Sequence, residues 1–315
     1  SLSMFRTMMK SKIHRARAPR QRGGAWLRGG ERIPFRRGSA IGGTAALGAA
    51  RRLLSPRSAG SASGLSTAAW LDRHVPDEAR ALAEMVVRTT SYTADHAAGD
   101  AATDLAQVRL GARGVRYLDG GWSSLVDQLL DRAVEAGVTV VHDRVVGVDV
   151  DPSGATVATG AGPDLHAGAV VLASGGAAHA DRLLRGASAA VSRWASAAHP
   201  VRAACLDVAL DRSPQPGRSA AYALDEPLYL VDHAATASLA PAGGAVLHGL
   251  FYEPGLRPDL DPRERLEAAL DVVQPGWRDH VVRSWYRRDL VVAHDRPLVA
   301  QEIAVALGIP VSSQI

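Results

Sequence analysis

The order of short apolar segments between residues 115 and 173 constrains the fold more than any other feature of this sequence of 315 residues. The pattern predicts a helix over 123–133 that Gly137 terminates, and a tight turn at 151–154 that closes a hairpin. Residues 117–122 are predicted as a turn after a short strand, and strands are predicted at 138–142, 145–151, 156–159 and 169–173. The last is a continuous apolar run, which is typical of a strand covered on both faces. Helices and strands in this order indicate an α/β fold.

The segments on either side of this block have other patterns. Upstream, Ser66 is a hydroxyl N-cap for one helix, Pro76 and Asp77 begin another with a single apolar face, and a short helix is expected over 45–54. Downstream of Pro200, turn residues separate strands expected at 203–210, 220–224, 228–232 and 245–251. These strands predict an antiparallel sheet. Further helices are expected to begin at 261–264 and at 275–277.

The charge of the chain is unevenly distributed. Residues 1–60 hold fourteen Lys or Arg and one acidic residue, Glu31, a net charge of +13, while the remainder holds 22 basic against 31 acidic residues, a net charge of −9. Basic segments can bind nucleic acid or acidic membrane. Because aromatic interleaving, a zinc pattern and a helical arginine stripe are all missing, we expect no nucleic-acid partner. Residues 1–62 are expected to form a basic, poorly ordered segment.

Two further features exclude classes of protein. The single cysteine, Cys205, excludes an intramolecular disulfide and a multi-cysteine metal site, and no metal site is predicted. No apolar run approaches the ~20 residues needed to span a bilayer, so we expect no transmembrane segment and a cytoplasmic protein. The pattern leaves the oligomeric state open.

A family resemblance rests on the ordered set of segments. The block Tyr117-Leu118-Asp119-Gly120-Gly121-Trp122, the helix after it, the strand with Val146 and the run 170–175 resemble the second FAD-binding segment of the amine oxidase, protoporphyrinogen oxidase and phytoene desaturase superfamily. Segments 204–210, 226–230 and 275–278 resemble the substrate-side sheet and flanking helix of its bacterial members. Together the similar segments cover about residues 66–292.

The resemblance implies a set of flavin contacts. They are Gly120, Gly121, Trp122, Val146, Ala173, Ser174 and Gly175. Adjacent glycines let the backbone approach a planar cofactor that a Cβ would block. Each position also has a structural interpretation: the glycine pair as a plain strand-to-helix turn, Val146 as a core valine, and 174–176 as a loop.

Tyr229 and His233 are the predicted substrate-pocket residues. They lie four positions apart on one predicted strand and so share a face. The alternative is a half-buried tyrosine and a surface histidine. We nominate no catalytic acid or base, because in flavin enzymes the cofactor takes the hydride while the protein positions a small-molecule substrate. His294-Asp295 is not assigned as a catalytic dyad, because no nucleophile motif accompanies it.

The sequence departs from the family pattern at both ends. Members begin with a strand, a Gly-x-Gly-x-x-Gly turn and a helix that cradle the FAD pyrophosphate, and no such motif exists here. The family's closing Gly-Asp flavin segment is also missing, because the similarity ends at about Val292. We therefore expect a truncated member, and tight binding of FAD by this chain alone is not expected.

These observations give one expected architecture and two functions. The fold is predicted to be α/β (α+β overall), an incomplete two-domain FAD/NAD(P)-binding fold. Its parts are the basic segment 1–62, a helical substrate-side module 63–112, a partial FAD-binding domain 113–190, an antiparallel substrate domain 198–292 and a divergent tail 293–315. The expected function is FAD-dependent removal of a hydride from an apolar or amine substrate. The alternative is a catalytically inactive remnant or interaction module that does not bind FAD.

Overall fold

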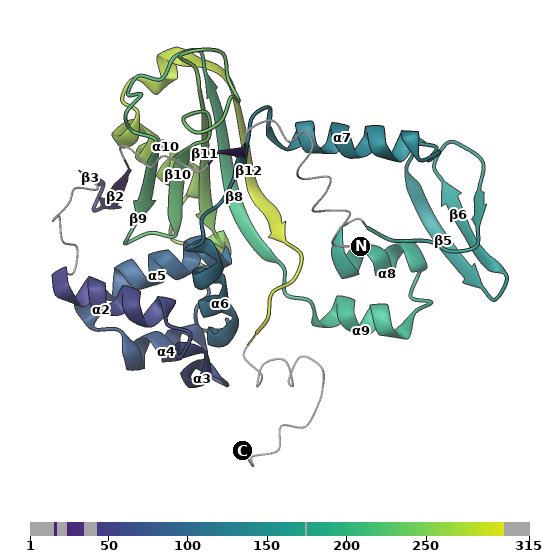
Figure 1. Cartoon of the computed structure of the whole chain (residues 1–315), viewed down its shortest axis with the longest axis horizontal. Helices are drawn as coiled ribbons and strands as arrows, with labels where there is room; N and C mark the ends of the chain where they lie inside the picture. The colour runs from purple at the N-terminus through teal and green to yellow at the C-terminus, as the bar shows by residue number, and fades with distance from the viewer. Residues whose placement is uncertain (1–15, 18–23, 35–42, 174, 299–315) are drawn as a thin grey trace.

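The computed structural model describes residues 16–17, 24–34, 43–173 and 175–298. Helices lie beneath a large sheet, and an arm of mixed structure stands beside both (Figure 1). The mixed α/β architecture predicted from the sequence is confirmed. Ser174 and most of the predicted tail, residues 299–315, lie outside the described residues, as do 1–15, 18–23 and 35–42 of the basic segment.

The helical module packs around its own apolar core. Its helices are α2 (Gly43–Leu54), α3 (Ser58–Ala62), α4 (Thr67–His74), α5 (Asp77–Ser91) and α6 (Ala101–Gly111). The side chain of Ser66 caps α4 by accepting a hydrogen bond from the Ala69 N–H, as predicted. Trp70 and Leu105 are almost fully buried at the centre of this core. Helix α6 was not predicted, because its apolar residues are not confined to one face.

The large sheet has the strand order β12-β8-β11-β10-β9-β2-β3 among the described residues. Its strands are β2 (Ala25–Arg28), β3 (Glu31–Pro34), β8 (Val201–Leu210), β9 (Ala220–Ala223), β10 (Leu228–Asp232), β11 (Ala245–Tyr252) and β12 (Val281–Ala293). Neighbours pair antiparallel, as predicted for 203–251, except that β2 runs parallel to β9. The β2–β3 hairpin comes from within the predicted basic segment and extends this sheet.

One face of the sheet is covered by helix α10 (Pro262–Val273), which Asp261 caps through the N–H groups of Arg263 and Glu264 (Figure 1). Leu266 and Leu270 of α10 pack on strand residues that point to this face at every second position. The opposite face of β9, β10 and β11 carries half-buried side chains. The two faces of the sheet therefore differ: the α10 side is apolar, and the opposite side carries aromatic and polar side chains.

The helix predicted from 275–277 is wrong except for its first turn, the 3-10 helix η2 (Trp277–His280). Residues 281–293 instead form the edge strand β12, which the sequence analysis missed. Most of its side chains are exposed and charged residues interrupt its apolar ones, so it lacks the alternation that reveals a half-buried strand. Beyond β12, Leu298 is buried, and a bridge to Gly99 attaches this segment to the helical module.

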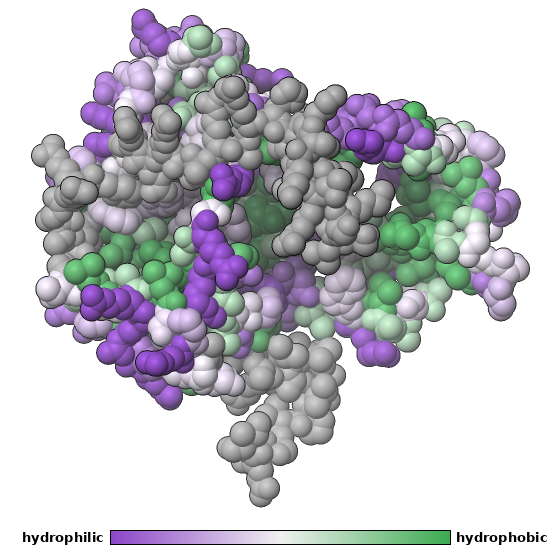
Figure 2. Space-filling view, in the orientation of Figure 1, coloured by the Kyte–Doolittle hydropathy of each residue, from purple (hydrophilic) through white to green (hydrophobic). Residues whose placement is uncertain are grey.

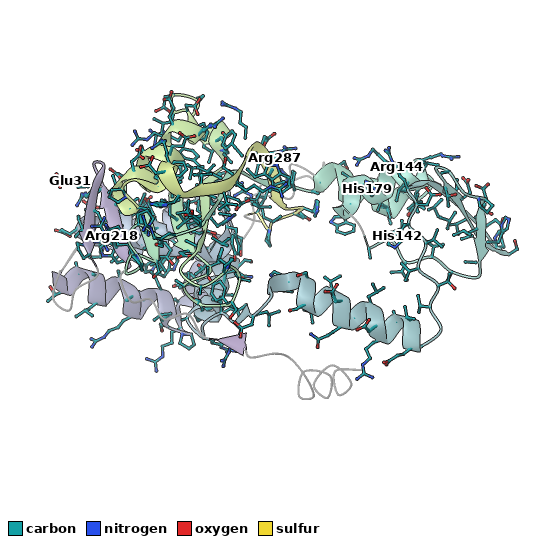
Figure 3. All side chains as sticks on the ribbon, turned by 90° about the horizontal axis from the view of Figure 1, so that it is seen from above. Glu31, His142, Arg144, His179, Arg218 and Arg287 are labelled. Carbon is teal, nitrogen blue, oxygen red and sulfur yellow. The ribbon has the colours of Figure 1, made fainter. Side chains whose placement is uncertain are left out.

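The arm comprises residues 121–197. Its elements are α7 (Gly121–Glu135), β5 (Val145–Asp151), β6 (Gly154–Thr159), β7 (Leu165–Ala167), α8 (Gly176–Leu184) and α9 (Ala189–Ala197). The predicted helix and the β5–β6 hairpin are confirmed, and the short strand β4 (Tyr117–Leu118) before α7 pairs with β1 (Ala16–Arg17). Seen from above, the arm with its labelled His142, Arg144 and His179 stands apart from the sheet (Figure 3).

The strands predicted at 138–142 and 169–173 are wrong, since neither segment forms a strand. Val171 is 89% exposed, although the pattern predicted a strand covered on both faces. Among the described residues neither segment belongs to a sheet, and an apolar run forms a strand only where another strand pairs with its backbone.

The arm also exposes much apolar surface, seen as green atoms in Figure 2. Helix α7 buries none of its side chains, and Trp122, Val126 and Val134 are more than half exposed. In the described part of the chain, no helix combines the length and the apolar character needed to cross a bilayer.

Candidate functional site

A cluster of rings lies on the sheet face opposite α10. Tyr222 of β9, Tyr229 of β10, and His248 and Tyr252 of β11 point to this face, because alternate residues of a strand share a side. The ring centroid of Tyr229 lies 6.1 Å from that of Tyr222, 5.8 Å from that of Tyr252 and 6.2 Å from that of His248. Tyr229 is therefore the centre of the cluster.

Two more rings extend this cluster toward the arm. The His233 ring lies 5.6 Å from that of His248, and the Tyr117 ring lies 5.3 Å from that of His233. We call Tyr117, Tyr222, Tyr229, His233, His248 and Tyr252 the ring cluster. It ends where strand β4 leads into the paired glycines that begin α7.

Hydrogen bonds hold that glycine turn against the sheet. The Ser238 N–H donates to Asp119 Oδ1 at 2.8 Å, and the Gly120 N–H donates to the Ser238 carbonyl at 3.1 Å. Since Ser238 follows β10 in the chain, these bonds fix the start of the arm beside the ring cluster. The predicted glycine turn and the predicted pocket residues His233 and Tyr229 are thus neighbours.

Burial shifts the pKa values of five groups of the ring cluster in the direction that favours their neutral forms. It lowers the pKa of His233 to about 4, with a smaller contribution from the His248 charge. It raises the pKa of Tyr229, and that of the almost fully buried Tyr252, above the ordinary tyrosine value. Cys205, on the neighbouring strand, has its thiol pKa raised to about 11 by burial. Neutral rings in this position suit an apolar or aromatic group.

One charged group joins the ring cluster. Asp207 of β8 lies opposite His248 of β11, and its Oδ1 is 2.5 Å from His248 Nδ1. His233 Nδ1 and the Tyr252 hydroxyl, by contrast, have no hydrogen-bond partner within the described residues. A carboxylate among aromatic faces can attract a cation, and aromatic faces themselves do so.

The predicted flavin contacts lie on the arm or at its start. Gly120 and Gly121 begin α7, and Trp122 in its first turn is 76% exposed. Val146 of β5 is 49% exposed, so it is not the core valine of the alternative interpretation. Ala173 is exposed just before α8.

Backbone conformation also explains why glycine occupies these positions. Gly120 and Gly121 both have positive φ, 81° and 74°, which favours glycine whether or not a ligand is near. Gly175 has φ 68°, and a Cβ there would lie 2.7 Å from the His179 Cβ. Backbone geometry alone therefore accounts for these glycines, and their assignment to the flavin stays a proposal.

A flavin dinucleotide fits these residues only in part. The exposed Trp122 and Val146 and the glycine turns leave accessible surface at the arm, where a planar group can pack. The printed sequence contains no Gly-x-Gly-x-x-Gly turn, which is the usual cradle for the pyrophosphate. The arm thus offers surface for the ring systems and lacks that turn for the phosphates.

The sequence analysis found Tyr229 and His233 and missed their partners. Both contact His248, which the structure brings between them from another strand. A signal for His248 existed, because positions 246, 248 and 250 share one face of the strand predicted at 245–251. Tyr252 lies one residue beyond that predicted strand. Asp207 gave no local signal, since it lies 41 residues from His248 and is paired with it only by strand register.

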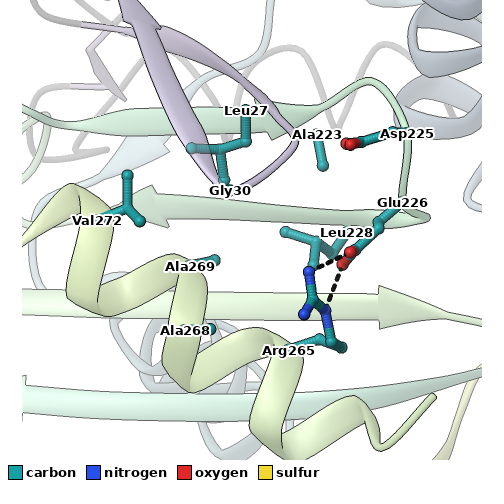
Figure 4. A pocket seen from close by; sticks show the side chains of 10 residues that line it. All are labelled: Leu27, Gly30, Ala223, Asp225, Glu226, Leu228, Arg265, Ala268, Ala269 and Val272. Atoms are coloured by element: carbon teal, nitrogen blue, oxygen red, sulfur yellow. Dashed lines mark hydrogen bonds and ion pairs between the residues drawn. The ribbon is translucent and has the colours of Figure 1, made fainter.

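A separate cavity of about 180 Å³ lies on the other side of the sheet, beside α10 (Figure 4). Leu27, Ala223 and Ala269 line it, and Arg265 forms an ion pair with Glu226 at its wall. It is smaller than the roughly 300 Å³ at which pockets for organic ligands begin. It shares no residue with the ring cluster, so we do not assign it to the substrate.

Comparison with protein families assigns the chain to a class of enzymes. The model of the family described as flavin containing amine oxidoreductase matches residues 56–275. The chain belongs to this family, and the predicted resemblance to amine oxidases is confirmed. A search of curated proteins found no match.

Solved structures share the fold. An oxidoreductase from Methanosarcina mazei aligns with a TM-score of 0.65 and 16% identity over 91% of this chain and 73% of that one. Cyclohexylamine oxidase from Brevibacterium oxydans IH-35A aligns with a TM-score of 0.61 and 17% identity, over 98% of this chain and 77% of its own. A putative protoporphyrinogen oxidase from Exiguobacterium sp. 255-15 aligns with a TM-score of 0.60 and 12% identity, over 97% of this chain and 77% of that one. At these identities the likeness establishes the fold alone.

Proposed function

We propose that this chain is an FAD-dependent oxidoreductase that removes a hydride from an amine bound on the ring cluster. The observation that carries the proposal is the contact between the Tyr117 and His233 rings, which joins the ring cluster to the glycine turn at Gly120. A substrate on the rings would therefore lie next to the surface that we assign to the flavin. Cyclohexylamine oxidase, with a shared fold, is named for an amine substrate, which supports this class.

The residue types suit an alkyl or aryl amine. Aromatic faces attract an alkylammonium group by about 0.5–2 kcal/mol each and also pack against its carbon atoms. Tyr222 and Tyr229 present stacked rings for the carbon skeleton, and Asp207 supplies a carboxylate near the nitrogen. Because His233 is neutral at pH 7, it does not repel a cation.

The cofactor would be held by the arm. We assign to its ring systems the contacts predicted from the resemblance, namely Gly120, Gly121, Trp122, Val146, Ala173, Ser174 and Gly175. When bound, FAD supplies the acceptor for the hydride. The protein's own contribution is to hold the donor carbon in position and to exclude water with buried rings such as Tyr229. Without a Gly-x-Gly-x-x-Gly turn, we expect this chain to bind FAD weakly.

A second candidate function is an interaction module that keeps the fold without the cofactor. The exposed apolar surface of the arm favours it, because such patches are often covered by another polypeptide. The two functions differ in one property: the enzyme binds FAD through the arm and the module does not.

Titration with FAD separates these candidates. We expect saturable quenching of flavin fluorescence with a Kd on the order of 10 μM, since an aromatic contact contributes without a pyrophosphate cradle. Trp122→Ala should weaken binding about fivefold, because the indole is the largest exposed ring in the proposed site. Leu47→Ala, which truncates another largely exposed apolar residue, on α2, should leave the Kd unchanged. A protein that stays colourless and does not quench FAD would favour the interaction module.

A further inference from the structure

His248 and Asp207 form a hydrogen-bonded pair at the middle of the ring cluster. They lie opposite each other on β11 and β8, with Nδ1 and Oδ1 2.5 Å apart. The His248 side chain is 23% exposed and that of Asp207 is 48% exposed. With Nδ1–H donating to the carboxylate, the imidazole carries its free lone pair on Nε2. The pair thus has an oriented base at one end and a path to water at the other.

The groups around this pair come from three strands. From β10, the rings of Tyr229 and His233 contact His248, and Val231 lies opposite it in the ladder. Cys205, two residues from Asp207 on β8, is a neutral thiol because burial raises its pKa. On the far side of β8, edge strand β12 places Trp285 opposite Asp207, and Arg283 and Arg287 flank Trp285 two residues away on either side.

We propose that His248, oriented by Asp207, accepts a proton from the ammonium form of the substrate before the hydride is removed. In this step an N–H bond of the ammonium breaks, its electron pair remains on the amine nitrogen, and a new N–H bond forms at His248 Nε2. Asp207 stabilises the resulting imidazolium through Nδ1–H. After the product leaves, the Nε2 proton passes to water at the partly exposed imidazole, and His248 returns to the form with Nδ1–H donating to Asp207. This inference rests on the proposed function and deepens it.

The chemistry requires such a step. Removal of a hydride from a carbon next to nitrogen builds positive charge on that carbon, and a free amine lone pair stabilises this charge while an ammonium opposes it. His233 is the other histidine of the ring cluster, but within the described residues its Nδ1 has no hydrogen-bond partner, so no carboxylate orients it there. Its pKa of about 4 makes it a poor acceptor at neutral pH. The geometry therefore selects His248.

A second His–Asp pair provides a matched control. His280 Nδ1 lies 3.1 Å from Asp211 Oδ1 at the end of the sheet, and in the described part of the chain its ring has no hydrogen bond or ring contact with the ring cluster. Its side chain is 20% exposed, close to the exposure of His248. The two pairs share residue types and a similar histidine exposure. They differ in their position relative to the rings, and the Nε2 of His280 lies 3.2 Å from Arg212 Nη2.

The test uses the full chain loaded with FAD and benzylamine as substrate. We expect His248→Asn to lower kcat/KM by about 10²–10⁴-fold at pH 7, as is typical of losing a general base. The loss should shrink toward zero as the pH rises to where benzylamine is itself a free base, because no proton acceptor is then needed. Asp207→Asn should show a smaller loss with the same recovery. His280→Asn should match the wild type at every pH.

A loss that is constant across the pH range would indicate a structural role for His248 and would overturn the inference. Nuclear magnetic resonance on the FAD-free chain gives a readout independent of turnover: benzylamine should shift the His248 ring signals and leave those of His280 in place. If benzylamine reduces the flavin but the ring signals of His248 do not shift, the inference fails and the oxidoreductase proposal stands. If no amine reduces bound flavin, the proposed function fails, and the catalytic role of His248 fails with it.

Discussion

Replacing Glu253 with glutamine is expected to lower the free energy of unfolding by about 3–5 kcal/mol, the usual effect of breaking a buried charged network. Glu253 Oε2 accepts hydrogen bonds from the Thr93 hydroxyl at 2.8 Å and from the N–H groups of Ala94 and Asp95 at 2.6 and 2.9 Å. Its side chain is 13% exposed, and its Oε1 lies 3.8 Å from Arg296 Nη1. One carboxylate thus connects the sheet to the end of the helical module.

The backbone of Glu253 supports this interpretation. Its φ of 42° lies in the left-handed region, where a non-glycine residue is strained, and the hydrogen bonds offset that cost. Urea unfolding of the variant measures the loss. Glu267→Gln is the control, because Glu267 pairs with exposed Arg263 and Arg278 at the surface and should cost less than about 1 kcal/mol. Equal losses in the two variants would show that Glu253 does not hold the module in place.

Acidification from pH 7 to pH 4.5 is expected to destabilise the protein through two histidines. Burial lowers the folded-state pKa of both His96 and His233 to about 4, whereas an unfolded histidine titrates near pH 6.5. Between these values the unfolded chain binds more protons than the folded protein. The contribution of the two neutral histidines to the free energy of unfolding is therefore complete above pH 6.5 and is lost as the pH falls toward 4. Each histidine contributes up to about 3 kcal/mol to this loss.

Asp104 acts in the opposite direction. Burial raises its folded-state pKa to about 6, so its contribution is complete below about pH 4 and is lost as the pH rises to 6. Since two histidines oppose one aspartate, the wild type should still be less stable at pH 4.5. Thermal unfolding of a His96→Gln and His233→Gln double variant should show this acid loss removed or reversed, while exposed His166→Gln should keep it. An unchanged acid loss in the double variant would contradict the assignment.

Much of the fold could be predicted because the signals were local. Asp261 caps α10 and Ser66 caps α4 with their own side chains, so each helix start is encoded within a few residues. The strands 203–251 are bounded by turn residues, and each pairs with a neighbour that lies within the described sheet. Local pattern and tertiary environment agree in these elements.

The failures share one physical cause, which is dependence on a distant partner. Runs 138–142 and 169–173 have strand composition, but composition cannot supply the neighbouring strand whose backbone would pair with them. Strand β12 has little alternation, and it forms because β8 provides a long edge. The same holds in the site, where Tyr229 was visible from its own strand and Asp207 became relevant only through its register with His248.

Anaerobic addition of amines to the FAD-loaded chain tests most directly whether the ring cluster is the surface from which an amine is oxidised. Benzylamine or cyclohexylamine should bleach the visible absorbance of the oxidised flavin, and Tyr229→Ala should slow the bleaching about tenfold, since three ring contacts are lost. An absorbance that stays constant with FAD bound, for every amine tried, would contradict the assignment of this surface.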